Sequence, residues 1–174
     1  DAPDLDLGPD GKVIVFVRQE NDRYRLEAFS CSFQQKIASD DLGLHRAVRV
    51  TLEDELKNLS QAFARLIPDV PRELTVNGAG AFEVGGPEGD NGLSGKKLVV
   101  DAYGPSVPIG GGALSGKDFF KVDRAGALHA RRLAKAVVMT GVASEALVRL
   151  SWFPGDSSAR LVSIQGEEGR WIEP

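Results

Sequence analysis

The stretch VIVFVRQENDRYRLEAFSCSF, residues 13–33, decides the type of fold because it has the pattern of a β-hairpin. Residues 13–18 are a short, mainly apolar run that is typical of a strand. The Asn-Asp-Arg sequence at 21–23 favours a turn, and residues 24–33 alternate well enough to predict a second strand. The sequence therefore predicts an antiparallel pair of strands near the start of the chain.

Beyond the hairpin, residues 44–67 have a helical period. Apolar residues recur there at intervals of three and four, and two prolines follow, which predicts a helix that ends at the prolines. These positions are Val48, Leu52, Leu56, Leu59, Phe63 and Leu66, followed by Pro68 and Pro71. Residues 73–77 are a candidate strand. The glycine-rich residues 78–95 predict a long loop, with a further possible strand at 81–84.

The second half of the chain repeats this plan. Its predicted elements are a strand at 97–103, a loop at 104–118, a helix at 122–139 that ends at Gly141, a pair of strands at 146–153 and 160–165, and a polar tail. Each half combines strands with one helix. We therefore expect an α+β fold of two layers, with helices on one face of mixed or antiparallel sheets and two similar, interleaved strand–helix units.

The composition is that of a soluble globular protein, since 42% of the 174 residues are hydrophobic and 26% are charged. A net charge of −4 predicts no general affinity for nucleic acid or anionic membrane, and no apolar run is long enough to cross a bilayer. Cys31 is the only cysteine, which excludes an intramolecular disulfide and fits the cytoplasm. The chain begins with Asp1 rather than Met, so we expect a preceding portion.

The loop GGGALSGKD, residues 110–118, has several features that favour binding of a phosphate. Its three successive glycines leave backbone N–H groups uncovered for an anion, and Lys117 adds a positive charge. Lys121, Asp123 and Arg124 follow at the start of the predicted helix, whose N-terminus itself favours anions. The alternative interpretation is an ordinary glycine turn before a solvated basic helix.

This loop is not the P-loop of a nucleotide hydrolase. Asp118 stands where a P-loop has the Ser or Thr that binds Mg²⁺, and residues 105–109 separate the loop from the preceding predicted strand. A carboxylate repels a polyphosphate unless a metal or a lysine lies between them. Asp118 and Asp123 are instead candidate ligands for Mg²⁺.

A second glycine-rich stretch, GGPEGDNG at residues 85–92, is followed by Lys96 and Lys97. Taken alone, it is compatible either with a flexible acidic loop or with a binding site. Together with the first loop, it resembles the S-adenosylmethionine synthetase (methionine adenosyltransferase) family. GGPEGDNGLSGKKLVVDAYG and GGGALSGKDFFKVDRAGALHARRLAKAVV match the family's motifs in order and spacing over about residues 80–140. A weaker resemblance extends back to the turn at 8–12 and forward to about residue 165.

The resemblance implies a reaction. The sulfur of methionine attacks C5′ of ATP and displaces triphosphate, which is then hydrolysed to phosphate and pyrophosphate with the help of Mg²⁺ and K⁺. It also implies active sites between two subunits, and therefore a homodimer or a higher oligomer. The family's K⁺ site, a second Mg²⁺ ligand and its His-Pro-Asp-Lys motif belong to an N-terminal part that these 174 residues do not include.

The resemblance also implies roles for single residues. Lys117, Lys121 and Lys97 match catalytic lysines, and Asp123 matches a Mg²⁺ ligand. The positions that match substrate or nucleotide contacts are Phe82, where the family stacks an aromatic ring on adenine, and Asp90, Lys96, Gly110, Gly111, Gly112, Ser115 and Arg124.

The sequence departs from the family pattern at four of these motif positions. Lys96 replaces an Arg, Ile109 replaces a His, Leu114 replaces a Phe, and Pro105 interrupts a Gly-Gly pair. We interpret residues 1–80 as part of a central-type synthetase domain and residues 81–174 as a C-terminal-type domain that carries the phosphate loop.

Three hypotheses follow. The chain is a divergent portion of a synthetase that needs an N-terminal polypeptide, a catalytically inactive nucleotide- or triphosphate-binding or regulatory homologue, or an unrelated interaction domain. In each case the isolated chain is expected to be inactive as a synthetase.

Overall fold

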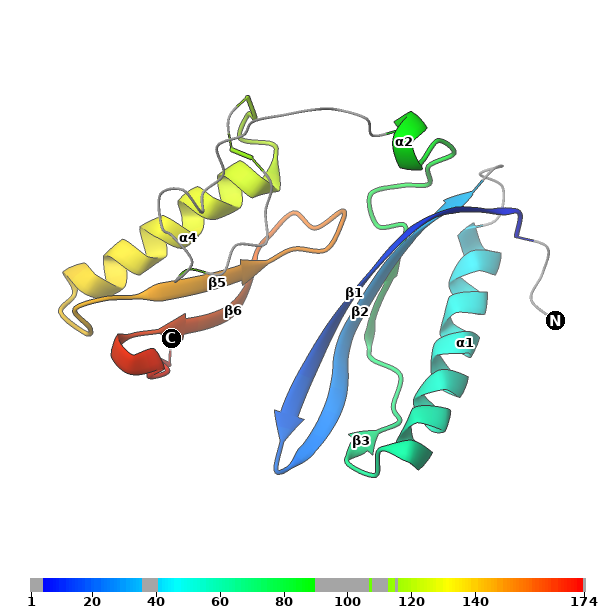
Figure 1. The fold of residues 1–174 in the computed structure, drawn as a ribbon, viewed down its shortest axis with the longest axis horizontal. Helices are drawn as coiled ribbons and strands as arrows, with labels where there is room; N and C mark the ends of the chain where they lie inside the picture. Colours follow the sequence, from blue (N-terminus) through cyan, green and yellow to red (C-terminus); the bar gives the residue numbers. More distant parts are fainter. Residues whose placement is uncertain (1–4, 36–40, 90–106, 108–112, 115, 174) are drawn as a thin grey trace. The chain divides into compact units, whose positions relative to one another are not determined.

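The computed structural model describes residues 5–35, 41–89, 107, 113–114 and 116–173 (Figure 1). The chain forms two compact units. The first comprises Asp1–Asn91 and Phe153–Asp156, and the second comprises Gly92–Trp152 and Ser157–Pro174. Within the described residues, no helix has the length and apolar character that a membrane span requires.

The first unit is built on a four-stranded mixed sheet. Strands β1 (Leu7–Glu20) and β2 (Arg23–Gln35) form the antiparallel hairpin that the sequence predicts, and both are longer than predicted. Strands β3 (Leu66–Ile67) and β4 (Glu73–Val76) each pair with β2 in parallel. The strand predicted at 73–77 is therefore confirmed.

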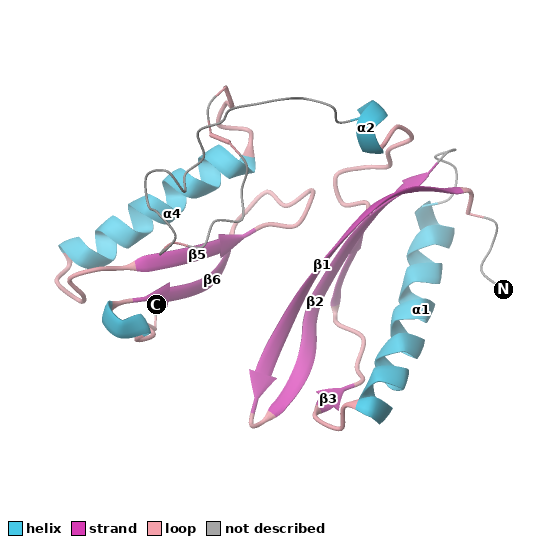
Figure 2. Cartoon of the chain, viewed as in Figure 1, coloured by secondary structure: helices cyan, strands magenta, loops and turns pink. Residues whose placement is uncertain are grey.

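Helix α1 (Asp41–Ala62) runs beside this sheet, contacts β3 and β4, and buries Leu44 and Leu56 (Figures 1 and 2). The sequence predicts a helix that ends near Ile67, and this end is wrong. The chain leaves the helix at Phe63, whose carbonyl accepts a hydrogen bond from the Leu66 N–H at 2.8 Å. Pairing with β2 accounts for the early end, because Leu66 and Ile67 are needed as strand residues.

The core of the first unit contains an asparagine that the sequence analysis missed. Asn77 is 9% exposed and has a left-handed backbone with φ of 47°. Its side chain accepts a hydrogen bond from the Phe33 N–H at 2.8 Å and donates to the Gln35 side-chain oxygen at 3.2 Å. It therefore ties the end of β4 to the end of β2, next to the buried Cys31.

The second unit contains α4 (Val122–Met139), the antiparallel pair β5 (Leu147–Ser151) and β6 (Arg160–Gln165), and the short 3-10 helix η2 (Glu167–Gly169). The helix has the predicted bounds, and the predicted closing pair of strands is confirmed with a shorter first strand. Helix α4 packs on β5. A Cβ at Gly126 would lie 2.9 Å from the Trp152 ring, so a glycine lets the ring approach the helix.

The described elements confirm the α+β class, with two sheets and helices beside them. Residues 81–84 form a single bridge between Phe82 and Gln34 rather than a strand, and the short helix α2 (Gly86–Gly89) follows. The strand predicted at 97–103 lies outside the described residues. The division into domains 1–80 and 81–174 remains a prediction.

Candidate functional site

The candidate site lies where the loop that carries Lys117, which we call the lysine loop, leads into α4 (Val122–Met139). A left-handed Gly116, with φ of 79°, turns the chain, and the N–H of Lys117 donates to the Leu114 carbonyl at 3.3 Å. A second turn follows, in which the Asp118 side chain accepts a hydrogen bond from the Phe120 N–H at 2.9 Å. These two turns set the direction in which Lys117 leaves the loop.

Lys117 and Asp123 form an ion pair at this junction. Their side chains are 25% and 32% exposed, so water screens the pair only in part. Asp123 belongs to the first turn of α4, where a negative charge is favourable because this is the positive end of the helix dipole. The pair thus holds a lysine ammonium group beside the positive end of a helix, which is an arrangement suited to an anionic ligand.

Arg124 holds the backbone of the same loop. Its guanidinium group donates a hydrogen bond to the Lys117 carbonyl and lies over the Phe119 ring, 5.0 Å from the centroid. Arginine is suited to both contacts because its planar group donates in a fixed direction and stacks on aromatic rings. The sequence analysis missed Phe119; its position five residues before an arginine gives no recognisable signal.

Lys121 is the more accessible lysine. Its ammonium lies 3.6 Å from the Asp118 carboxylate, and both side chains are more than half exposed. Such exposed pairs contribute at most about 1 kcal/mol, so Lys121 can exchange this partner for a ligand at little cost. Lys121 is also the N-cap of α4, and its own side chain makes no capping hydrogen bond.

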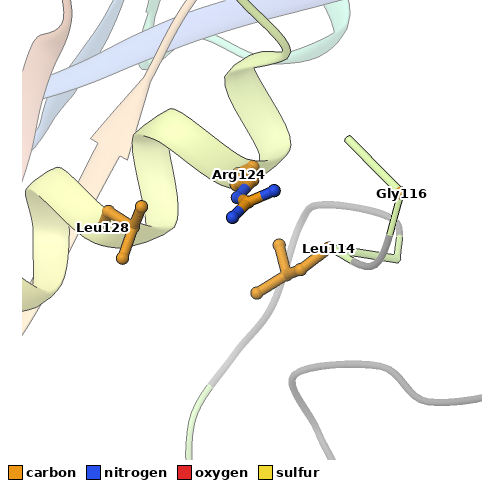
Figure 3. A pocket seen from close by; sticks show the side chains of 4 residues that line it. All are labelled: Leu114, Gly116, Arg124 and Leu128. Atoms are coloured by element: carbon orange, nitrogen blue, oxygen red, sulfur yellow. The ribbon is translucent and has the colours of Figure 1, made fainter. Parts of the chain in front are cut away.

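The loop and the helix border an open hollow of about 430 Å³ (Figure 3). Leu114 and Gly116 line it from the loop, and Arg124 and Leu128 line it from α4, with the guanidinium group directed toward the loop (Figure 3). Leu114, one of the departures from the family pattern, therefore supplies an aliphatic wall to this hollow.

The structure brings together three of the predicted site residues, Lys117, Asp123 and Arg124, with Lys121 close by in sequence. Phe82 belongs to the first unit, where its carbonyl accepts a hydrogen bond from the Gln35 N–H at 3.0 Å. The remaining predicted site residues lie outside the described part of the chain: Asp90, Lys96, Lys97, Gly110, Gly111, Gly112 and Ser115.

The described residues allow a test of whether Mg²⁺ fits. Among them, no three His, Cys, Asp or Glu side chains come together as a metal site. Mg²⁺ nevertheless often uses only one or two protein carboxylates and completes its shell with phosphate oxygens and water. The Asp123 carboxylate, at the junction of loop and helix, fits that kind of shared site.

Comparison with known proteins defines the class. A family model described as the C-terminal domain of S-adenosylmethionine synthetase matches residues 84–170, which include the loop and α4. The chain is 41% identical over 167 residues to the S-adenosylmethionine synthase of Gloeobacter violaceus, with 91% of this chain and 39% of that protein covered. It is 37% identical over 167 residues to that of Thermus thermophilus, with 92% and 39% covered.

The chain therefore belongs to the S-adenosylmethionine synthetase family. It spans about two fifths of the length of these curated relatives. The matches cover more of the chain than the family model does, so the similarity includes residues of the first unit as well as the second.

Proposed function

We propose that this chain is a portion of an S-adenosylmethionine synthetase, which makes S-adenosylmethionine from ATP and methionine and releases phosphate and pyrophosphate. The observation that carries the proposal is the Lys117–Asp123 pair at the start of α4, within a chain about 40% identical to synthases. The similarity of this chain to these relatives favours the hypothesis of a synthetase portion over that of a stand-alone binding homologue.

In the proposed reaction, the site at the start of α4 stabilises the leaving triphosphate. When sulfur attacks C5′, the C5′–O bond breaks and the electron pair leaves with the triphosphate, whose negative charge grows. Groups that stabilise this charge and are already in place lower the barrier most effectively. Lys117 and Lys121 would bind the triphosphate oxygens, and Asp123 would hold a Mg²⁺ ion that shares those oxygens.

In this proposal Arg124 fixes the direction of Lys117 through the loop backbone, and Leu114 and Leu128 give the hollow beside it two aliphatic walls. Mg²⁺, when bound, supplies positive charge to the triphosphate. The K⁺ site is expected outside this chain, as are the remaining catalytic groups. We further propose a cytoplasmic homodimer or higher oligomer, with ATP and methionine bound between subunits.

Binding of triphosphate tests the site directly. Calorimetry with Mg²⁺ and tripolyphosphate is expected to show binding by the 174-residue chain. Lys117→Ala should weaken it by at least about tenfold, because a charge-assisted hydrogen bond contributes about 1.5–3 kcal/mol. Lys135→Ala is the matched control, since it removes the same charge from an exposed position on α4, away from the loop. Equal effects of the two substitutions would refute a specific role for Lys117.

Activity requires the complete protein. Incubation of ATP and methionine with the product of the full reading frame should give S-adenosylmethionine, detected by mass spectrometry, and the isolated chain should give none. The Lys117→Ala variant of the complete protein should lose most of its turnover. If the complete protein makes no S-adenosylmethionine, the synthetase proposal is wrong even when triphosphate binds.

A further inference from the structure

A ring of hydrogen bonds in the first unit joins three segments that are remote in sequence. The Asp10 N–H donates to the Gln34 side-chain oxygen at 3.2 Å, and the Gln34 side-chain nitrogen donates to the Glu83 carbonyl at 2.9 Å. The Gly86 N–H closes the ring by donating to the Asp10 carboxylate at 2.8 Å. We call this arrangement the Asp10–Gln34 latch.

The latch explains glycines in two motifs that the proposed function leaves unexplained. A Cβ at Gly8 would lie 2.4 Å from the Gln34 side chain. A Cβ at Gly85 would lie 2.7 Å from the Asp10 carboxylate and 3.1 Å from the Gln34 side chain. Both glycines therefore make room for the same two side chains. The Gly-Pro-Asp-Gly sequence at 8–11, predicted as a turn but found inside β1, and the Gly-Gly-Pro sequence at 85–87 therefore form a single structural feature.

The latch acts on the segment that carries Phe82. Gln34 holds Glu83, the next residue, and the backbone of β2 holds the Phe82 carbonyl through the Gln35 N–H. Asp10 holds Gly86, the first residue of α2, near the beginning of the second glycine-rich stretch. The latch thus fixes both the aromatic residue and the entry to that stretch.

We propose that Gln34 and Asp10 are positioning residues, which hold residues 82–86 in the conformation that receives the nucleotide. This inference rests on the proposed function, in which Phe82 matches an aromatic residue that stacks on adenine. Gln34 acts only through the segment, because its amide oxygen and nitrogen both bond within the latch. When the hydrogen bonds of the latch are lost, a smaller fraction of the molecules has the conformation that binds the nucleotide. The apparent affinity then falls in proportion to that fraction.

The test compares Gln34→Leu, which keeps the bulk and removes both hydrogen bonds, with Gln19→Leu on the exposed part of the same hairpin. Amide exchange of Asp10 and Gly86 is measured by NMR on the free chain, and Mg²⁺–ATP affinity by calorimetry. We expect Gln34→Leu to speed exchange at both amides by about tenfold and to weaken ATP binding by about fivefold or more. Gln19→Leu should change neither quantity.

Asp10 provides a second variant pair. Asp10→Ala should speed Gly86 exchange and weaken ATP binding in the same way, whereas Asp10→Asn keeps an acceptor oxygen and should restore both to within about twofold. Should Gln34→Leu fail to fold, Gln34→Glu replaces it, since Glu still accepts from the Asp10 N–H but cannot donate to the Glu83 carbonyl.

Each outcome decides one part of the inference. Unchanged exchange in Gln34→Leu and Asp10→Ala overturns the latch itself, whatever the ATP affinity. Faster exchange with unchanged ATP affinity overturns the positioning role. If the unmodified chain does not bind ATP, nucleotide binding by this chain is refuted together with the positioning role, and the exchange data alone establish whether the latch orders the segment.

Discussion

The two glycine-rich segments of this chain are held in place in opposite ways. Residues 82–86 are fixed by groups far away in sequence: the Gln34 side chain bonds to the Glu83 backbone over 49 positions, and the Asp10 side chain bonds to the Gly86 backbone over 76. The lysine loop is fixed by the charged side chains of Asp123 and Arg124, which follow Lys117 by only six and seven positions. The first segment therefore depends on the packing of its whole unit, whereas the second depends on a local set of charges.

The largest expected effect comes from disturbing the long-range packing. A Cβ at Gly78 would lie 2.3 Å from the Pro154 carbonyl oxygen, so Gly78→Ala should destabilise the first unit by about 3 kcal/mol. Gly116→Ala meets no atom of the described residues within 4 Å and has to tolerate only a positive φ, which costs about 1 kcal/mol. Urea unfolding followed by circular dichroism measures both, and equal losses would contradict the distinction between the two regions.

Cys31 reports on the same packing. Burial raises the pKa of its thiol from 9.0 to about 11, so the thiolate fraction near pH 8 should fall roughly a hundredfold below that of an ordinary cysteine. Alkylation by iodoacetamide should therefore be about a hundredfold slower in the folded chain than in urea. In Gly78→Ala the rate should rise, and in Gly116→Ala it should not. Equal rates in folded and unfolded protein would show that the thiol is accessible.

A smaller effect is expected from the local charges. Arg124→Lys keeps the charge but cannot both donate to the Lys117 carbonyl and stack on Phe119. The free energy of unfolding should fall by about 1 kcal/mol, because one hydrogen bond and one cation–π contact are weakened. Arg132→Lys, on the exposed face of α4, is the control and should change nothing measurable. Equal stabilities of the two variants would show that Arg124 does not hold the loop.

This contrast also explains which features could be predicted from the sequence. Helix α4 and its lysine loop were predictable because helix period, turn glycines and charges are all local signals. The hairpin was predictable for the same reason. The role of Gln34 was not, because its partners, Asp10 and Glu83, come close only through the pairing of β1 with β2 and the bridge to Phe82.

The end of α1 is a further example of tertiary packing overriding a local pattern. Leu66 continues the helical period of the sequence, yet it pairs with Tyr24 of β2 as a strand residue. The Tyr24 N–H also bonds to the Arg65 carbonyl at 2.8 Å. The spacing of apolar residues at three and four therefore predicted the helix correctly for most of its length. It placed Leu66 in the helix although this residue belongs to β3.

The smallest effect concerns a long-range contact in the second unit. The Glu167 carboxylate of η2 accepts hydrogen bonds from the Ser144 hydroxyl and N–H, which tie the end of β6 to the turn before β5. The Ser144 hydroxyl, and then its N–H, lower the pKa of Glu167 from 4.5 to about 2. Since the folded pKa is the lower one, this stabilisation is present above about pH 4.5 and is lost as the pH falls toward 2.

Glu167→Gln should therefore lower the melting temperature slightly at pH 7 and make almost no difference once the pH falls to about 2 and below, where the native carboxyl becomes protonated. Glu168→Gln, at the neighbouring residue, serves as the control and should leave the melting temperature unchanged at both pH values. The gap between Glu167→Gln and the unmodified chain should close between about pH 4.5 and 2. A gap of the same size at pH 2 would mean that the Glu167 side chain acts through its shape and not through its charge. The contact between η2 and Ser144 would then differ from the lysine loop, which is held by charged side chains.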